Sequence, residues 1–167
     1  LGTEGGGYLT KIGDGCLFMA STHVGHDCIV GNGVIIANNA PLGGHVIVED
    51  RAIIGGNAAV HQHSRIGRGA IVGGLTGVER DVIPYASVTG DRARLAGLNL
   101  VGLRRAKADR AHISDLRACV DFIFTEGEGN VAARATEAAG RWTTPLAADV
   151  CRFMLAESSR HFVTPKG

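Results

Sequence analysis

Residues 12–83 read, in blocks of six, IGDGCL FMASTH VGHDCI VGNGVI IANNAP LGGHVI VEDRAI IGGNAA VHQHSR IGRGAI VGGLTG VERDVI. Every block opens on an apolar residue, and seven of the twelve carry glycine second. An α-helix repeats near 3.6 residues and a plain strand near 2, so neither produces this pattern. Hexapeptide repeats are the signature of a parallel β-helix, in which three hexads form one coil of about 18 residues. Residues 12–83 therefore predict four coils, with the apolar residues pointing inward and the glycines easing the backbone around the corners.

The composition is consistent with a solenoid and excludes other classes. Of the 167 residues 25 are glycine, 45% are hydrophobic and only 5% are aromatic, although a single globular core normally depends on large rings. Such a chain buries its apolar surface in many small, similar pieces. It is too apolar for a disordered protein and lacks the glycine triplets of collagen. No apolar stretch approaches the roughly 20 residues of a membrane-spanning helix.

Charge and cysteine content limit the partners and the cellular location that the sequence predicts. The formal net charge of +1 gives no indication of nucleic acid or of an anionic membrane as a partner. The four cysteines have neither CxxC spacing nor the density of a disulfide scaffold, which favours a reduced, cytoplasmic location. The sequence begins at Leu1 without an initiator Met or a signal-like segment. Because its first residues read as the middle of a repeat, we expect further coils upstream.

Glycine content divides the chain into two predicted domains. Residues 1–90 hold 19 of the 25 glycines and residues 91–167 hold 6. The first part is expected to be a mainly β domain, the β-helix. The second part is expected to be a C-terminal α-helical domain, because its apolar residues recur at steps of three and four.

The predicted helices have recognisable ends. One contains Ile113, Leu116, Val120 and Phe124, with Asp109 or Ser114 as its cap. Residues 126–129, Glu-Gly-Glu-Gly, predict a break. Two further helices are expected over residues 131–139 and 145–158.

Histidines are the residues most suggestive of chemistry. Five of the seven lie within 41 residues: His23, His26, His45, His61 and His63. In a coil of about 18 residues, positions 26, 44 and 62 share one column and positions 45 and 63 share the next. Since successive coils lie about 4.8 Å apart, these histidines are expected to cluster on one wall of the solenoid. An imidazole titrates near neutrality and suits either proton transfer or metal binding.

Two chemistries can use this cluster. In the first, a histidine oriented by a carboxylate removes a proton from a substrate hydroxyl. Asp27 follows His26 directly, but neighbouring strand residues face opposite sides, so the orienting carboxylate need not be Asp27. In the second, three histidines bind Zn²⁺ and leave a fourth position for water, as in a hydro-lyase resembling γ-class carbonic anhydrase. A non-catalytic polar ladder on a solenoid surface is the third reading. Spacing alone does not separate them.

Several segments closely resemble the acyl-carrier-protein-dependent UDP-N-acetylglucosamine O-acyltransferase family, which starts lipid A biosynthesis. The matching segments are residues 22–28 (THVGHDC), 38–46 (NNAPLGGHV), 54–62 (IGGNAAVHQ), Gly5–Gly7 with 9–13 (LTKIG), and 97–99 (GLN) with 102–105 (GLRR). The His-x-x-His-Asp-Cys string and the Gly-Leu-Asn segment are the most specific. A related N-acyltransferase of the same pathway shares the hexads but is disfavoured by the Asp-Cys after His26.

The resemblance implies a left-handed β-helix, a homotrimer and active sites between neighbouring subunits. It implies transfer of a 3-hydroxyacyl group from acyl carrier protein to the 3-hydroxyl of UDP-N-acetylglucosamine. The donor is the phosphopantetheine thioester, and neither a metal nor another cofactor takes part. His26 would be the general base, Asp27 its support, and the Gly44 N–H the oxyanion donor.

The resemblance also implies a set of substrate-binding residues. They are His23, His45, Gln62 and Asn99 as substrate contacts, and His61 and Gly74 along the acyl groove. The basic residues themselves make Arg105 the best single candidate for a phosphate contact. Arg105 belongs to a run of six basic residues in positions 92–110, which also suits an acidic carrier protein through charge-assisted contacts.

Overall fold

The computed structural model describes residue 7, residues 9–124 and residues 130–165. Gly5 and Gly6 of the family resemblance and the predicted break at 126–129 lie outside the described residues. The chain forms two compact units. One takes in the chain up to Asn99 together with the segment that begins at Ser159, and the other is Leu100–Ser158. The sequence predicted a domain boundary near residue 90. In the structure the β unit continues to Asn99 and also includes the segment that begins at Ser159.

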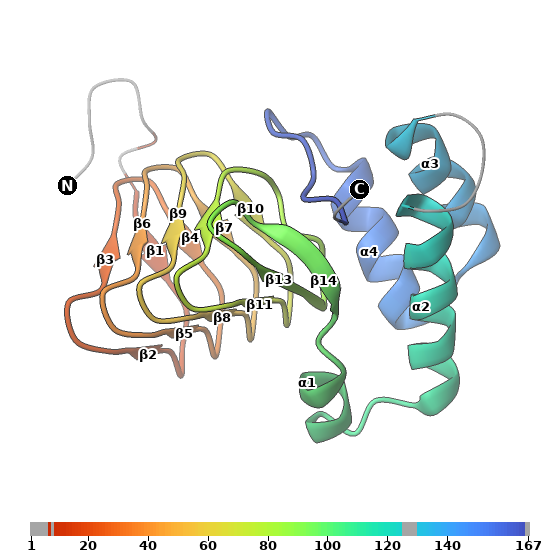
Figure 1. Cartoon of the computed structure of the whole chain (residues 1–167), viewed down its shortest axis with the longest axis horizontal. Helices are drawn as coiled ribbons and strands as arrows, with labels where there is room; N and C mark the ends of the chain where they lie inside the picture. Colours follow the sequence, from red (N-terminus) through yellow and green to blue (C-terminus); the bar gives the residue numbers. More distant parts are fainter. Residues whose placement is uncertain (1–6, 8, 125–129, 166–167) are drawn as a thin grey trace. The chain divides into compact units, whose positions relative to one another are not determined.

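The first unit is a parallel β-solenoid built from two-residue strands (Figure 1). Each coil contributes one strand to each of three sheets, here called sheets A, B and C. Sheet A contains β1 (Lys11–Ile12), β4 (Ile29–Val30), β7 (Ile47–Val48) and β10 (Arg65–Ile66). Sheet B contains β2 (Leu17–Phe18), β5 (Ile35–Ile36), β8 (Ile53–Ile54) and β11 (Ile71–Val72), followed by β13 (Ala86–Thr89) and β14 (Arg94–Leu98). Sheet C contains β3 (His23–Val24), β6 (Pro41–Leu42), β9 (Ala59–Val60) and β12 (Gly77–Val78).

The strand register confirms the 18-residue coil. In sheet A, Ile12 lies opposite Val30, and Val30 lies opposite Val48. Each hexad's first residue therefore stacks on its counterpart one coil away, and most of these side chains are fully buried, Ile36 and Ile54 among them. Burying a side chain of this kind contributes about 1.5–3 kcal/mol. The predicted fold class, a parallel β-helix followed by helices, is confirmed.

The repeated glycines have a different cause from the one expected. A Cβ on Gly25 would lie 2.7 Å from the carbonyl carbon of Gly43, and one on Gly55 would lie 2.6 Å from the amide nitrogen of Gly74. Neither glycine has a positive φ, and most of the left-handed corners are occupied by side-chain-bearing residues such as His45, with φ of 60°. Close stacking of neighbouring coils, and not freedom of the backbone at the corners, therefore requires these glycines.

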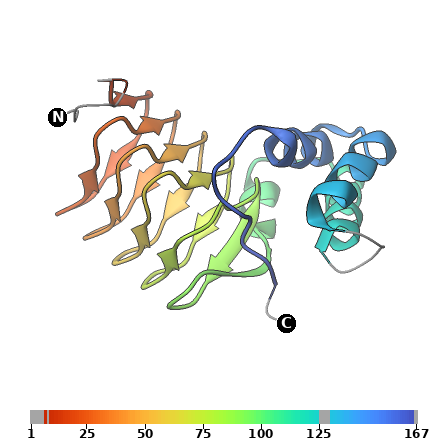
Figure 2. The same cartoon turned by 90° about the horizontal axis from the view of Figure 1, so that it is seen from above.

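The last coil is closed by strands of its own unit. β13 continues sheet B parallel to β11, and β14 then pairs with β13 in the antiparallel direction. The segment from Ser159 runs alongside this end, where Asp81 bridges Phe162. Figure 2 shows the coils following one another along the solenoid axis.

The described residues of the second unit form four helices. They are α1 (Leu100–Arg105), α2 (Arg110–Phe124), α3 (Val131–Arg141) and α4 (Pro145–Leu155). α1 was not predicted. The Asp109 Oδ1 accepts a hydrogen bond from the Ala111 N–H at 2.7 Å, so Asp109 precedes and caps α2. The prediction of Ser114 as a cap is wrong, because Ser114 lies inside α2. Among the described residues, no helix is long and apolar enough to cross a membrane.

Candidate active site

The histidines gather at the corner that links sheet C to sheet A. His26 lies in the turn between β3 and β4, His45 between β6 and β7, and His63 between β9 and β10. The rings of His26 and His45 meet edge to face with centroids 4.9 Å apart, and those of His45 and His63 stack at 4.7 Å. Stacking of coils therefore brings them together as expected, but at a corner and not on a flat wall.

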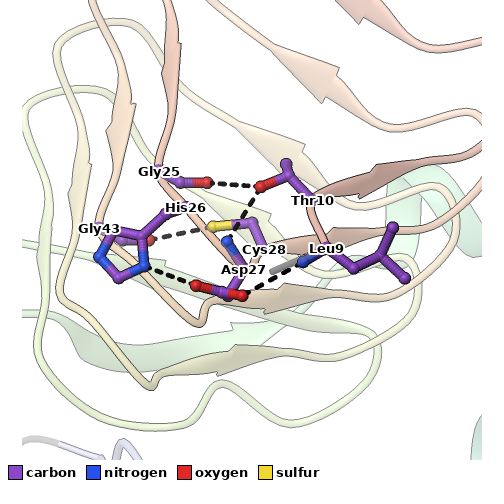
Figure 3. A network of polar contacts seen from close by, with 7 residues as sticks. All are labelled: Leu9, Thr10, Gly25, His26, Asp27, Cys28 and Gly43. Atoms are coloured by element: carbon purple, nitrogen blue, oxygen red, sulfur yellow. Dashed lines mark hydrogen bonds and ion pairs between the residues drawn. The ribbon is translucent and has the colours of Figure 1, made fainter. Parts of the chain in front are cut away.

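His26 and Asp27 form a hydrogen-bonded pair. The distance between His26 Nδ1 and Asp27 Oδ2 is 2.8 Å (Figure 3). Asp27 has a left-handed backbone, with φ of 58°. The alternation of faces holds for extended strands and does not apply to this turn. The residue pattern left the orienting carboxylate open, and the structure places the adjacent Asp27 in contact with His26, as the resemblance implied.

Asp27 is held in place from the preceding coil. Its Oδ1 accepts from the Leu9 N–H at 3.3 Å, and its own N–H donates to Thr10 Oγ1 at 2.9 Å (Figure 3). The hydrogen bond from His26 lowers the pKa of the buried Asp27 carboxyl, against the opposing effect of burial. An ionised Asp27 accepts the Nδ1–H of a neutral His26, which leaves Nε2 of His26 as a proton acceptor.

Nε2 of His26 lies over Gly44. A Cβ added to Gly44 would come within 2.5 Å of His26 Nε2, so only glycine fits beneath the ring. Within the part of the chain that the structure describes, the Gly44 N–H donates to no protein acceptor. A proton acceptor and an available backbone donor are therefore neighbours.

A groove of about 570 Å³ passes beside this corner and over the outer face of sheet C. Four residues predicted for the site line it: His23, His26, Gly44 and His61. Its floor includes small residues, Gly43, Ala59 and Gly77, alternating with apolar ones. A groove with a mainly apolar floor is suited to an acyl chain or another slender ligand.

Other predicted residues lie elsewhere in the chain. Gly74 lies between β11 and β12, at the corner joining sheets B and C. Asn99 is buried near the corner joining sheets A and B, where its Nδ2 donates to the Gly69 carbonyl at 2.9 Å. Gln62 shares the column of His26 and Gly44, but its side chain does not line the groove. Arg105 ends α1 in the second unit.

Two residues at the groove were not predicted. Glu79 lines it and lies 18 positions after His61, so the column pattern alone indicates its place. Arg160 contacts His61 at 2.8 Å between Nη2 and Nδ1. No repeat or motif links Arg160 to His61, so the sequence held no signal for this contact.

A metal site is a further possibility for the cluster. One ligand atom from each of His26, Asp27 and His45 can be chosen so that all lie within 4.8 Å of one another. Two imidazoles and a carboxylate differ from the three histidines of the zinc alternative. A metal that took Nδ1 of His26 or Oδ2 of Asp27 would have to displace their mutual hydrogen bond.

Comparisons with known proteins agree on one family. A model described as UDP N-acetylglucosamine O-acyltransferase, domain 2, matches residues 81–163, and one for bacterial transferase hexapeptide repeats matches residues 9–44. Acyl-[acyl-carrier-protein]–UDP-N-acetylglucosamine O-acyltransferases are similar along almost the whole chain. That of Methylobacterium radiotolerans is 55% identical over 99% of this chain and 61% of its own length. That of Paracoccus denitrificans is 48% identical over 98% and 62%.

The chain belongs to the UDP-N-acetylglucosamine O-acyltransferase family.

A solved structure of a family member supports the same assignment. UDP-N-acetylglucosamine acyltransferase from Campylobacter jejuni has a TM-score of 0.90 at 32% identity, over 99% of this chain and 64% of that one. The left-handed form of the β-helix that the resemblance implied is the fold shared with these family members. The chain spans about three fifths of the length of the curated relatives named above.

Proposed function

We propose that this chain carries the general base of an acyl transfer reaction that belongs to lipid A biosynthesis. In it a 3-hydroxyacyl group passes from acyl carrier protein to the 3-hydroxyl of UDP-N-acetylglucosamine. The observation that carries the proposal is the His26–Asp27 pair, 2.8 Å apart, with the second nitrogen of His26 over Gly44 beside the groove. The proposed substrates are taken from the names of the related enzymes described above.

The proposed step needs only groups of the protein. Nε2 of His26 takes the proton of the sugar hydroxyl as its oxygen attacks the thioester carbonyl. Asp27 stabilises the imidazolium that forms. The oxyanion of the tetrahedral intermediate accepts a hydrogen bond from the Gly44 N–H, a contribution of about 3–4 kcal/mol to lowering the barrier. The intermediate then collapses, the carbon–sulfur bond breaks, and the departing thiolate takes the proton from His26. Neither a metal nor a redox cofactor has a role in it.

The same proposal includes a homotrimer. Within one chain, the substrate residues expected from the resemblance lie at different corners: His26 between sheets C and A, Gly74 between B and C, and Asn99 near the corner of A and B. Neighbouring copies, packed side by side, bring different corners together, which suits sites shared between subunits. Exposed aliphatic residues on the solenoid surface, such as Leu17 and Ile47, are available for that packing.

Partners and location follow from the same proposal. Acyl carrier protein and UDP-N-acetylglucosamine are the expected partners, with Arg105 as a phosphate contact. We expect a cytoplasmic location, because four cysteines without CxxC spacing suit a reducing environment.

Replacing His26 with alanine in the full-length protein tests the function. We expect transfer to fall by about 10³-fold, because a positioned base typically contributes 10² to 10⁴. Turnover is measured by product mass with acyl carrier protein donors of several chain lengths. His63→Ala is the matched control, since His63 belongs to the cluster but does not line the groove. Unchanged turnover in His26→Ala would rule out His26 as the base, and light scattering would show whether the trimer is preserved.

A further inference from the structure

The chain's last described segment places an arginine against a groove residue. Arg160 Nη2 lies 2.8 Å from His61 Nδ1 and 2.9 Å from the Gln62 carbonyl oxygen. His61 lines the groove that holds His26. All of these residues belong to the first unit. A side chain from the segment that begins at Ser159 therefore contacts the ring of a groove residue.

This contact determines where the His61 proton lies. A guanidinium has five N–H donors and no acceptor, so Nδ1 of His61 must accept. The ring then carries its proton on Nε2. Nδ1 also lies 3.2 Å from the Gln62 carbonyl oxygen, a contact that would be a hydrogen bond only in the opposite tautomer. The contact to Arg160 is shorter and charge-assisted, and the Gln62 oxygen already accepts from Arg160, so the Nε2–H form is favoured.

We propose that Arg160 is a positioning residue that holds His61 as its Nε2–H tautomer, so that His61 donates a hydrogen bond to an oxygen atom of the acyl donor. The identity of the ligand rests on the proposed function. The tautomer of His61 does not depend on it.

The surroundings of Arg160 support a role at the groove. A second hollow of about 290 Å³ is lined by His61, Glu79, Arg80, Ser159, Arg160 and His161. His61 and Glu79 line both hollows, which are therefore neighbours at these two residues. A ligand that extends from the catalytic corner toward this end passes His61. Without Arg160, the Gln62 carbonyl is the nearest partner for Nδ1, and the proton is expected to move to Nδ1.

The first measurement is the tautomer itself. Full-length protein with ¹⁵N-labelled histidine is examined by NMR, and a His61→Gln variant assigns the ring signals. Arg160→Met keeps the length of the side chain and removes the donors. We expect the native ring to show an unprotonated Nδ1 and the Arg160→Met ring a protonated one. Arg80→Met is the matched control, because Arg80 lines the same hollow without a contact to Nδ1, and it should leave the signals unchanged.

The second measurement is steady-state kinetics with both substrates varied. Loss of one hydrogen bond to the acyl donor corresponds to about a tenfold rise in its KM. We expect kcat and the KM for UDP-N-acetylglucosamine to stay within about twofold, and Arg160→Lys to restore part of the KM and the native tautomer. A merely structural arginine would change thermal stability without moving the ring signals.

The outcomes separate the claims. An unprotonated Nδ1 in Arg160→Met overturns the proposal, as does a flipped tautomer with an unchanged KM for the donor. If the native protein transfers no acyl group, the proposed function fails, and the NMR signals still decide the positioning role. If Arg160→Met does not fold, Arg160→Leu, which also lacks the donors, supplies the same comparison.

Discussion

At the scale of single residues, the left-handed backbone of Asp27 positions the proposed base, His26. Asp27 adopts φ of 58°, and this turn lets its carboxylate reach the ring of the preceding residue. The carboxylate is in turn held by the Leu9 N–H. His26 thus gains a fixed tautomer from its immediate neighbour, and Gly44 leaves space for its other nitrogen. The residue types indicated this chemistry, whereas strand alternation left open which carboxylate orients His26.

Asp27→Asn should make stability less dependent on pH. Because the pKa of Asp27 is lowered from its usual 3.8, mainly by its hydrogen bond with His26, the ionised native state is favoured. This contribution is complete above the unfolded-state pKa and is lost as pH falls through the lower native pKa. Urea unfolding of both proteins from neutral to strongly acidic pH measures this contribution. The difference between their free energies of unfolding should be constant near neutral pH and should shrink as the solution becomes acidic.

A difference that grew as the pH fell would contradict this assignment. Asp14→Asn is the control, because the Asp14 side chain is exposed. It should change the pH dependence of unfolding less than Asp27→Asn does.

At the scale of elements, two-residue strands are stable only because neighbouring coils stack without gaps. The first residue of each hexad fills the core, and the second lies where the next coil's backbone comes closest. Where a hexad carries glycine second, as at Gly25 and Gly55, packing between coils requires it. The hexad pattern was readable from the sequence, but the reason for its glycines required coordinates.

Gly55→Ala and Gly56→Ala should distinguish a glycine that packing between coils requires from a glycine that it does not require. A Cβ at Gly55 would lie 2.6 Å from the Gly74 backbone, whereas one at Gly56 would lie 3.6 Å from the Asn38 carbonyl oxygen, an ordinary contact. We expect Gly55→Ala to lower the free energy of unfolding by about 3 kcal/mol through overpacking. Gly56→Ala should be neutral or raise it by about 0.5 kcal/mol, because alanine restricts the unfolded chain.

Chemical denaturation followed by circular dichroism measures both free energies. Equal effects of the two substitutions would show that coil spacing does not determine where glycine is needed.

At the scale of the whole molecule, the chain's end returns to the solenoid. The Asp81 N–H donates to the His161 carbonyl at 2.9 Å, and the Val163 N–H donates to the Asp81 carbonyl at 2.8 Å. The Asp81 side chain is fully buried and pairs with Arg65 Nε at 2.7 Å. One aspartate thus connects the last coil to a segment about 80 residues later, the same segment that carries Arg160.

Arg65→Met should destabilise the first unit strongly. It leaves the Asp81 carboxylate buried without its cation, a change that typically costs about 3–5 kcal/mol. Combining Arg65→Met with Asp81→Asn should recover most of that loss, because the uncompensated charge is gone. Urea unfolding of the single and double variants measures this coupling. A double variant no more stable than Arg65→Met would show that charge burial is not the cause.

The sequence by itself determined the solenoid, its 18-residue coil and the gathering of histidines at neighbouring columns. It could do so because stacking repeats locally, so a residue's position follows from its place in the hexad. It also predicted α2, α3 and α4 to within a few residues, since their apolar spacing is equally local. The family resemblance added candidate roles for particular residues.

Only the tertiary structure decided which groups meet outside this repeat. The left-handed turn at Asp27 joins it to His26, the corners separate Gly74 and Asn99 from the histidines, and the chain's return brings Arg160 to His61. The physical reason is the same in each case. These contacts depend on backbone turns and on segments remote in sequence, and neither is encoded in a six-residue period.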